Sequence, residues 1–190
     1  MSKRMMTPLA AAVVLGLAVG PAHGEGDGHN SSNLRSELQG ASELPVVVTG
    51  ATGSFRATIS EDDTSFTYEL DYADLEGSVT QAHIHLAQPF ANGGIAVWLC
   101  KTGLVTVPAT VPADTPVCGA PGGADAEAAG TISAEDVLGP TGQGVPVASF
   151  ADVLWAIRTG NAYVNVHSTI APGGEIRGQL APGGHSHHEQ

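Results

Sequence analysis

Three histidines have the spacing of a metal site built on two neighbouring β-strands. His83 and His85 lie two residues apart in the segment 81–86, and His167 ends the segment 163–167. Because residues i and i+2 of an extended strand share a face, His83 and His85 point the same way. If the two strands are neighbours, all three imidazoles converge, and imidazole is a common ligand of copper and zinc. The spacing predicts one mononuclear site, with copper favoured over zinc because copper binds nitrogen ligands more tightly.

The residues between these histidines are aliphatic. Ala82, Ile84 and Leu86 oppose the histidine face of the first segment, and Val164 and Val166 oppose it in the second. Each strand is therefore expected to pack its aliphatic side into a core. The alternative to a metal site is a network of hydrogen bonds in which the imidazoles tie the strands together.

Three polar residues near His167 are candidates to support the site. Asn165 shares the face of His167 and could donate to a ligand, or be satisfied by backbone groups. Glu175 is expected to be a structural partner in its turn. Arg177 could orient a ligand or an anion, or form an ion pair with Glu69, Asp71 or Glu175.

The C-terminal segment 182–190 reads as a flexible, histidine-rich tail. His185, His187 and His188 form a weaker second metal site there, because imidazoles on a mobile segment can bind copper, nickel or zinc.

The N-terminal segment 1–24 has the pattern of a signal peptide. Lys3 and Arg4 precede an apolar run at 9–19, and small residues lead up to Gly24, after which we expect cleavage. The run is short for a membrane span, and no later segment qualifies as one. The alternative is a retained N-terminal anchor. The prediction is export, to the periplasm or the medium.

The mature chain is acidic. Cleavage removes Lys3 and Arg4 but no acidic residue, so the formal charge of −12 becomes −14. An acidic surface argues against nucleic acid and anionic membranes as partners. A metal ion or an extracellular protein is the expected partner.

The two cysteines are separated by a segment rich in proline and glycine. In an oxidising compartment, Cys100 and Cys118 are expected to form one disulfide that pins this loop. The alternative is a pair of thiolate metal ligands, although no CxxC spacing accompanies them.

Strand and turn signals alternate along most of the chain. Segments 52–60 and 65–72 alternate around an acidic turn and predict a hairpin, and 79–88, 95–100, 162–168 and 175–180 are further strands. Segment 100–130 is expected to be a long excursion. A capping box begins a short helical turn at Ser133, and a longer helix is expected over 150–159, with Trp155 off its apolar stripe and packed under a loop.

These signals predict an all-β fold, an antiparallel Greek-key-type β-sandwich or barrel with one short helix and a disulfide-pinned loop. The expected organisation is a signal peptide at 1–24, a flexible segment at 25–33, one domain at 34–181 and the tail at 182–190.

Several ordered motifs resemble the chordin-type domain family, known as CHRD. They are AHIH at 82–85, GIAVWLC at 94–100, TISAEDV at 131–137, YVNVHS at 163–168 and PGGEIRGQ at 172–179. The resemblance covers about 34–180. It implies an extracellular binding domain, since animal members belong to a growth-factor antagonist, whereas stand-alone secreted members mostly have no assigned function.

A second, looser resemblance is to the copper/zinc superoxide dismutases, which implies a superoxide dismutase-like fold. That family has an H-x-H on one strand, a late copper histidine, a glycine-rich loop and an arginine. His83, His85, His167 and Arg177 follow the same order. Because no histidine lies between His85 and His167, the pattern lacks the residue that would bridge two metals.

The sequence thus predicts an exported CHRD-like binding module that holds a single copper ion through three strand histidines, and a binding role rather than an enzymatic one. The alternatives are a copper-dependent, dismutase-like redox enzyme and a metal-free structural or protein-interaction domain.

Overall fold

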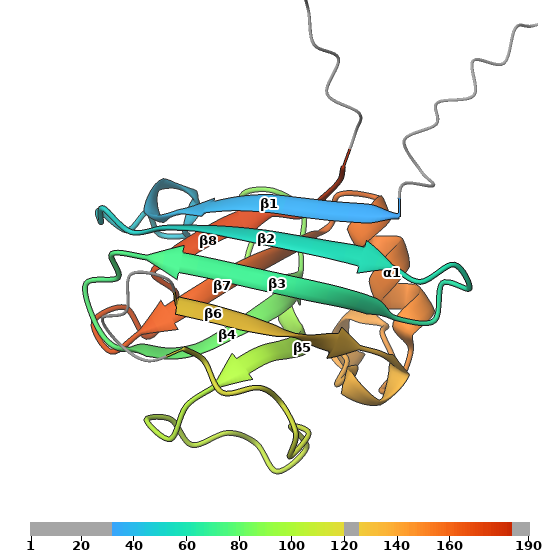
Figure 1. Cartoon of the computed structure of the whole chain (residues 1–190). Coiled ribbons are helices and arrows are strands. Elements are labelled where there is room, and N and C mark those ends of the chain that lie inside the picture. The colour runs from blue at the N-terminus through green and yellow to red at the C-terminus, as the bar shows by residue number, and fades with distance from the viewer. Residues whose placement is uncertain (1–31, 120–125, 184–190) are drawn as a thin grey trace, which may run out of the picture.

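A nearly closed antiparallel barrel forms the body of the protein (Figure 1). The computed structural model describes residues 32–119 and 126–183. The strands are β1 (Asn33–Gln39), β2 (Thr52–Ile59), β3 (Phe66–Ala73), β4 (Val79–Leu86), β5 (Gly94–Lys101), β6 (Ala126–Ile132), β7 (Ala162–Ser168), β8 (Ile176–Gln179) and β9 (Ala181–Pro182). The helix α1 spans Phe150–Arg158, and single 3₁₀ turns span Gly40–Ser42, Ala134–Asp136 and Thr141–Gln143.

The strand order explains how the two histidine strands meet. It runs β5-β4-β7-β8-β1-β2-β3-β6, with β9 beside β1. All pairs between these strands are antiparallel. In this order β4 and β7 are direct neighbours, although they lie far apart in sequence. The expected all-β antiparallel sandwich or barrel with one short helix is confirmed, as a nearly closed barrel.

The barrel interior is built from alternating apolar residues. Phe55 of β2, Leu70 of β3 and Ile84 of β4 are each fully buried. The predicted hairpin is present, because β2 and β3 pair along their whole length from Thr52 opposite Ala73 to Ile59 opposite Phe66. One face of α1 covers an end of the barrel (Figure 1), and Phe150 packs its ring 5.8 Å from that of Phe66.

Four expectations about the periphery were wrong. The segment 100–130 is not an excursion throughout, because its last part forms β6, which pairs with β3. Trp155 is 65 % exposed rather than packed under a loop, since its side of α1 faces solvent. Asn33 begins β1 instead of ending a flexible segment. Pro182 pairs with Leu34, so the expected tail begins inside β9.

The predicted disulfide between Cys100 and Cys118 is present, and both residues are buried. It joins the end of β5 to the loop that follows, over a sequence separation of 18. It closes the same loop in the unfolded chain, which lowers the entropy of the unfolded state.

Replacing both cysteines by serine is expected to lower the free energy of unfolding by about 3 kcal/mol, the loop-entropy value for this separation. Urea unfolding of the oxidised protein and of the double variant measures the difference. An equal midpoint and slope would contradict the expectation.

No helix in the described ranges is long and apolar enough to cross a membrane. The expected signal peptide at 1–24, most of the expected flexible segment and the histidines of the tail lie outside the described residues.

Candidate metal centre

The outer face of β4 and β7 carries the three histidines. In the antiparallel register, His83 lies opposite Asn165, His85 opposite Tyr163, and His167 opposite Gln81. The intervening aliphatic residues fill the barrel, and Ile84 and Val164 are completely buried. Alternation along two paired strands therefore gathers the imidazoles on one face, as the i, i+2 spacing predicts.

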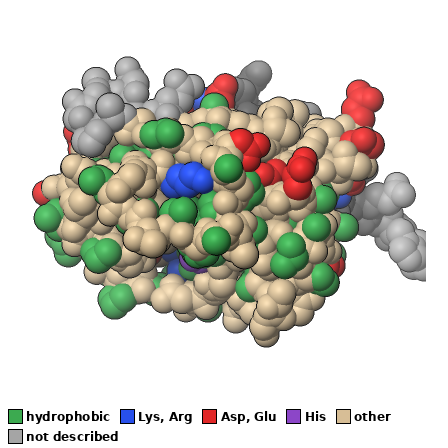
Figure 2. Space-filling model, turned by 90° about the horizontal axis from the view of Figure 1, so that it is seen from below, with side chains coloured by type: hydrophobic (Ala, Val, Ile, Leu, Met, Phe, Trp, Pro, Cys, Tyr) green, Lys and Arg blue, Asp and Glu red, His purple; other side chains and the backbone are tan. Residues whose placement is uncertain are grey.

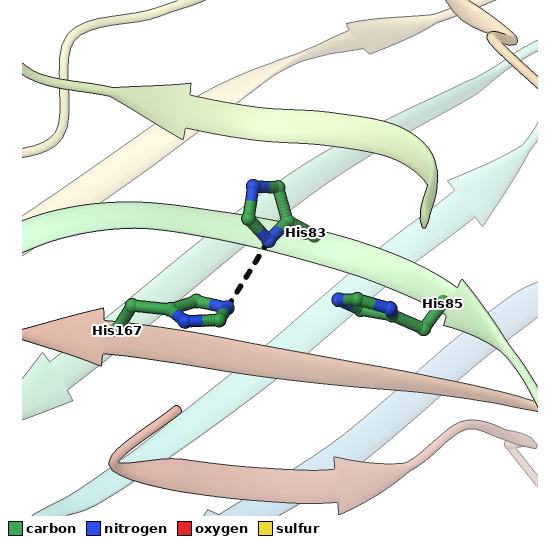
Figure 3. A group of neighbouring side chains, drawn as sticks. All are labelled: His83, His85 and His167. Atoms are coloured by element: carbon green, nitrogen blue, oxygen red, sulfur yellow. Dashed lines mark hydrogen bonds between the residues drawn. The ribbon is translucent and has the colours of Figure 1, made fainter. Parts of the chain in front are cut away.

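The three rings converge closely enough to hold one ion (Figure 3). One ring nitrogen from each of His83, His85 and His167 lies within 4.8 Å of the other two. His83 Nδ1 and His167 Nε2 are 3.1 Å apart. Two nitrogens bound to one ion at about 2.0–2.1 Å can be at most about 4.2 Å apart. A separation of the full 4.8 Å would have to shorten by about 0.6 Å when a metal binds.

The site is enclosed. His83, His85 and His167 are 1 %, 9 % and 6 % exposed, and histidine atoms are visible only within a narrow hollow of the surface in Figure 2. The ring of Trp98 stands edge-to-face with His83 at 4.2 Å, and the ring of Tyr163 stacks parallel to His85 at 4.8 Å. Aromatic rings thus fix the orientation of two of the three imidazoles.

Backbone carbonyls determine which nitrogen two of the histidines present. His85 Nδ1 lies 2.9 Å from the carbonyl oxygen of Gly93, and His167 Nδ1 lies 3.0 Å from that of Pro172. A carbonyl only accepts, so each Nδ1 carries the proton and donates it. The Nε2 atoms of His85 and His167 then hold free electron pairs. In this tautomer each ring can bind a metal ion through Nε2.

Gly93 is needed for the first of these contacts. A Cβ at this position would lie 1.9 Å from the carbonyl oxygen of Leu86, so only glycine lets the loop approach the end of β4 closely enough. The tight loop places the Gly93 carbonyl over His85.

The imidazole cluster has unsatisfied nitrogen atoms. His83 Nε2 and His85 Nε2 are buried and have no hydrogen-bond partner. An unpartnered buried polar atom costs free energy. A bound cation would satisfy His85 Nε2, because the Nδ1 atom of this ring already donates to Gly93.

Burial keeps all three histidines neutral. It lowers the pKa of His83 to about 2 and that of His85 to about 4, and it also lowers the pKa of His167. The neighbouring imidazoles lower the first two further, whereas the Gly93 carbonyl partly counteracts the shift of His85. Neutral imidazole is the form that binds metals.

Asn165 contacts the histidine cluster directly. Its side chain is 3 % exposed, and its Oδ1 atom lies 3.1 Å from His167 Nε2. Asn165 therefore contacts one of the three histidines, and the asparagine is not satisfied by backbone groups alone.

Arg177 has different partners from those expected. It forms no ion pair with Glu69, Asp71 or Glu175 within the described part of the chain. Its guanidinium donates to the Ala91 carbonyl at 2.7 Å and to Asn92 Oδ1 at 3.1 Å. The same guanidinium lies 3.4 Å above the centre of the Tyr163 ring, which stacks on His85. The loop carbonyls satisfy Arg177 in place of a carboxylate.

Glu175 is a structural residue beside the site and does not belong to the histidine cluster. Its Oε1 atom accepts hydrogen bonds from Thr49 Oγ1 at 2.9 Å and from the Glu76 backbone at 2.7 Å. This agrees with the structural role expected for it, although its partners lie in two other loops.

Glu43 is the residue near the site that the sequence did not single out. It is 4 % exposed, and burial raises its pKa to about 7, while Arg177 and Asn165 lower it. It lies in the loop after β1, where no periodic pattern relates it to the histidines. A carboxylate directly before the Leu44-Pro45 pair was the available signal.

Comparison with known protein families identifies the chain. A family model described as CHRD domain matches residues 34–180, which include all three histidines and the disulfide. No curated protein and no solved structure matches the chain. The matched range spans more than half of the sequence, and the chain therefore belongs to the CHRD domain family.

Proposed function

We propose that this protein is an exported CHRD-domain binding module that holds one metal ion through His83, His85 and His167, and that the ion is copper. The observation that carries the proposal is the convergence of three buried, neutral imidazoles whose nitrogens are left partly unsatisfied. A structural hydrogen-bond network would be expected to pair these nitrogens with protein donors or acceptors.

Copper is preferred to zinc for two reasons. Divalent copper binds nitrogen ligands more tightly than zinc at the same site, and an exported protein meets copper outside the cytosol. The high degree of burial favours retention of an ion over turnover of an external substrate, which supports a binding role rather than a dismutase-like one.

Titration with copper and with zinc tests the proposal, in a chain that lacks residues 184–190 so that the tail histidines do not contribute. One tight equivalent of copper is expected, with weaker zinc binding, as measured by competition with a chelator and by metal content.

The absence of binding by the folded, disulfide-bonded chain would contradict the proposal. It would favour the metal-free alternative, a protein-interaction domain in which the imidazoles stabilise the sheet. Binding of copper accompanied by superoxide turnover would instead favour the redox enzyme.

Export is part of the proposal and has its own test. The disulfide supports an oxidising compartment, since such bonds are rare where thiols are kept reduced. The protein isolated from its source should begin at Glu25, as measured by the intact mass. An intact mass that includes Met1–Gly24 would contradict cleavage.

A further inference from the structure

We propose that the side-chain oxygen of Asn165 is a fourth ligand of the same ion, and that the buried carboxyl group of Glu43 holds the Asn165 amide in the orientation that presents this oxygen. The inference rests on the proposed function, because it adds an oxygen donor to the three-histidine site.

Asn165 occupies the position that a fourth ligand needs. It lies on β7 directly opposite His83 of β4, two residues before His167 on the same strand. Its Oδ1 atom is 3.1 Å from His167 Nε2. The amide therefore reaches the space that the three imidazoles share.

The contact between Asn165 Oδ1 and His167 Nε2 has no proton on the histidine side, because the Pro172 carbonyl sets the tautomer of His167. His167 donates its Nδ1 proton to the Pro172 carbonyl, so Nε2 is an acceptor. Asn165 Oδ1 is also an acceptor, and two acceptors 3.1 Å apart repel each other unless a positive charge lies between them. His83 Nδ1 can supply one proton, which satisfies the electron pair of His167 Nε2 alone. A cation would satisfy both this electron pair and that of Asn165 Oδ1.

The observed distances fit the edges of a coordination shell. Ligand atoms at about 2.0–2.1 Å from one ion in tetrahedral geometry lie about 3.3–3.4 Å apart. Both contacts of His167 Nε2, with Asn165 Oδ1 and with His83 Nδ1, measure 3.1 Å. Each of these two pairs of atoms already has nearly the spacing of two ligands of one ion.

The opposite amide orientation would remove the oxygen from the site, and Glu43 opposes it. A Cβ at Gly174 would lie 2.3 Å from Glu43 Oε1 and 2.8 Å from Asn165 Nδ2, so these two side chains occupy the same small space. Glu43 is 4 % exposed and its Oε1 atom has no hydrogen-bond partner, so this buried acceptor favours a donor beside it over a second oxygen. The nitrogen of the amide therefore belongs on the Glu43 side, and the oxygen on the histidine side.

Gly174 makes this arrangement possible. Its φ of +122° disfavours any side chain, and the space above it is filled by Glu43 and Asn165. Any Cβ at position 174 would force the two side chains apart.

An amide oxygen is a harder donor than imidazole, so it contributes more to binding Cu(II) than to binding Cu(I). Asn165→Leu keeps the approximate size of the side chain and removes the oxygen. In the chain that lacks residues 184–190, this variant is expected to bind Cu(II) at least about 10-fold more weakly, with a smaller change for Cu(I), and to alter the electron paramagnetic resonance spectrum of bound Cu(II).

Three further variants make the test specific. Asn161→Leu is the matched control, since Asn161 bonds to Thr159 outside the site, and it should leave both measurements unchanged. Glu43→Gln should weaken Cu(II) binding in the same direction as Asn165→Leu, but less. Asn165→Asp replaces the amide oxygen by a carboxylate oxygen and should change the electron paramagnetic resonance spectrum of bound Cu(II) while the ion stays bound, so this variant tests the proposal if Asn165→Leu does not fold.

The outcomes separate the two proposals. Wild-type affinity and an unchanged spectrum in Asn165→Leu, with one copper bound, would overturn the role of Asn165 and leave the three-histidine site intact. An unchanged spectrum in Asn165→Asp would overturn it equally. A parent chain that binds no copper would overturn both.

Discussion

Replacing both His83 and His85 by alanine is expected to abolish stoichiometric copper binding while the barrel stays folded. The variant retains one of the three imidazoles that converge within 4.8 Å. Loss of a supporting hydrogen bond to a metal ligand costs about 10–100-fold in affinity, so loss of two ligands should cost far more than about 100-fold. Competition titration measures the affinity, and circular dichroism measures the fold.

The matched control for this variant removes the same number of imidazoles from the tail. In the full chain, His187→Ala/His188→Ala should keep the tight equivalent and lose only weaker sites. If the strand variant kept its tight copper while the tail variant lost it, the site would lie in the tail.

The second large effect is acid destabilisation of the metal-free protein. The pKa values of His83 and His85 in the folded state lie well below those in the unfolded state, because burial favours the neutral rings. The unfolded chain therefore binds more protons below about pH 6.5, and stability falls as the pH falls. Between pH 7 and pH 5 the loss is about 2 kcal/mol for each of these two histidines, and His167 acts in the same direction.

Glu43 changes the stability in the opposite direction as the pH falls. It must therefore be replaced before the effect of the histidines can be measured. Its pKa is raised to about 7, so its protonated form stabilises the fold at low pH and the contribution is lost as the pH rises from about 4.5 through 7. Between pH 7 and pH 5 it offsets about 2 kcal/mol of the loss from the histidines.

Urea unfolding of Glu43→Gln with a chelator present should therefore show a fall of at least about 4 kcal/mol from pH 7 to pH 5, and the parent protein a smaller one. Equal pH dependence in the two proteins would argue against a buried, titrating Glu43. A variant whose stability did not change with pH would argue against neutral, buried histidines.

The strands and the histidine cluster could be predicted because both follow from a period of two residues. Alternation at Phe55, Ala57 and Ile59 gives the hairpin, and the i, i+2 relation of His83 and His85 gives the shared face. The pairing of β4 with β7 had to be assumed, since periodicity within a strand does not specify its neighbour.

Strand β6 and the partners of Arg177 could not be predicted, because they depend on close contacts and on the paths of loops. Strand β6 consists largely of alanine, glycine and threonine, which give no alternation of large apolar residues. It packs because Gly130 has no side chain where the ring of Tyr68 lies, 3.1 Å from a Cβ built there. Likewise, Ala91 and Asn92 meet Arg177 only because the loop folds back over the sheet, so its partners could not be read from strand spacing.

The central claim is that one ion is held jointly by the three strand histidines. Anomalous diffraction at the copper absorption edge, from crystals of the chain lacking 184–190 with one equivalent of copper, tests it most directly. We expect one strong peak at about 2.0–2.1 Å from a nitrogen of each of His83, His85 and His167. A peak elsewhere on the protein, with the three imidazoles still at their metal-free separations, would contradict it.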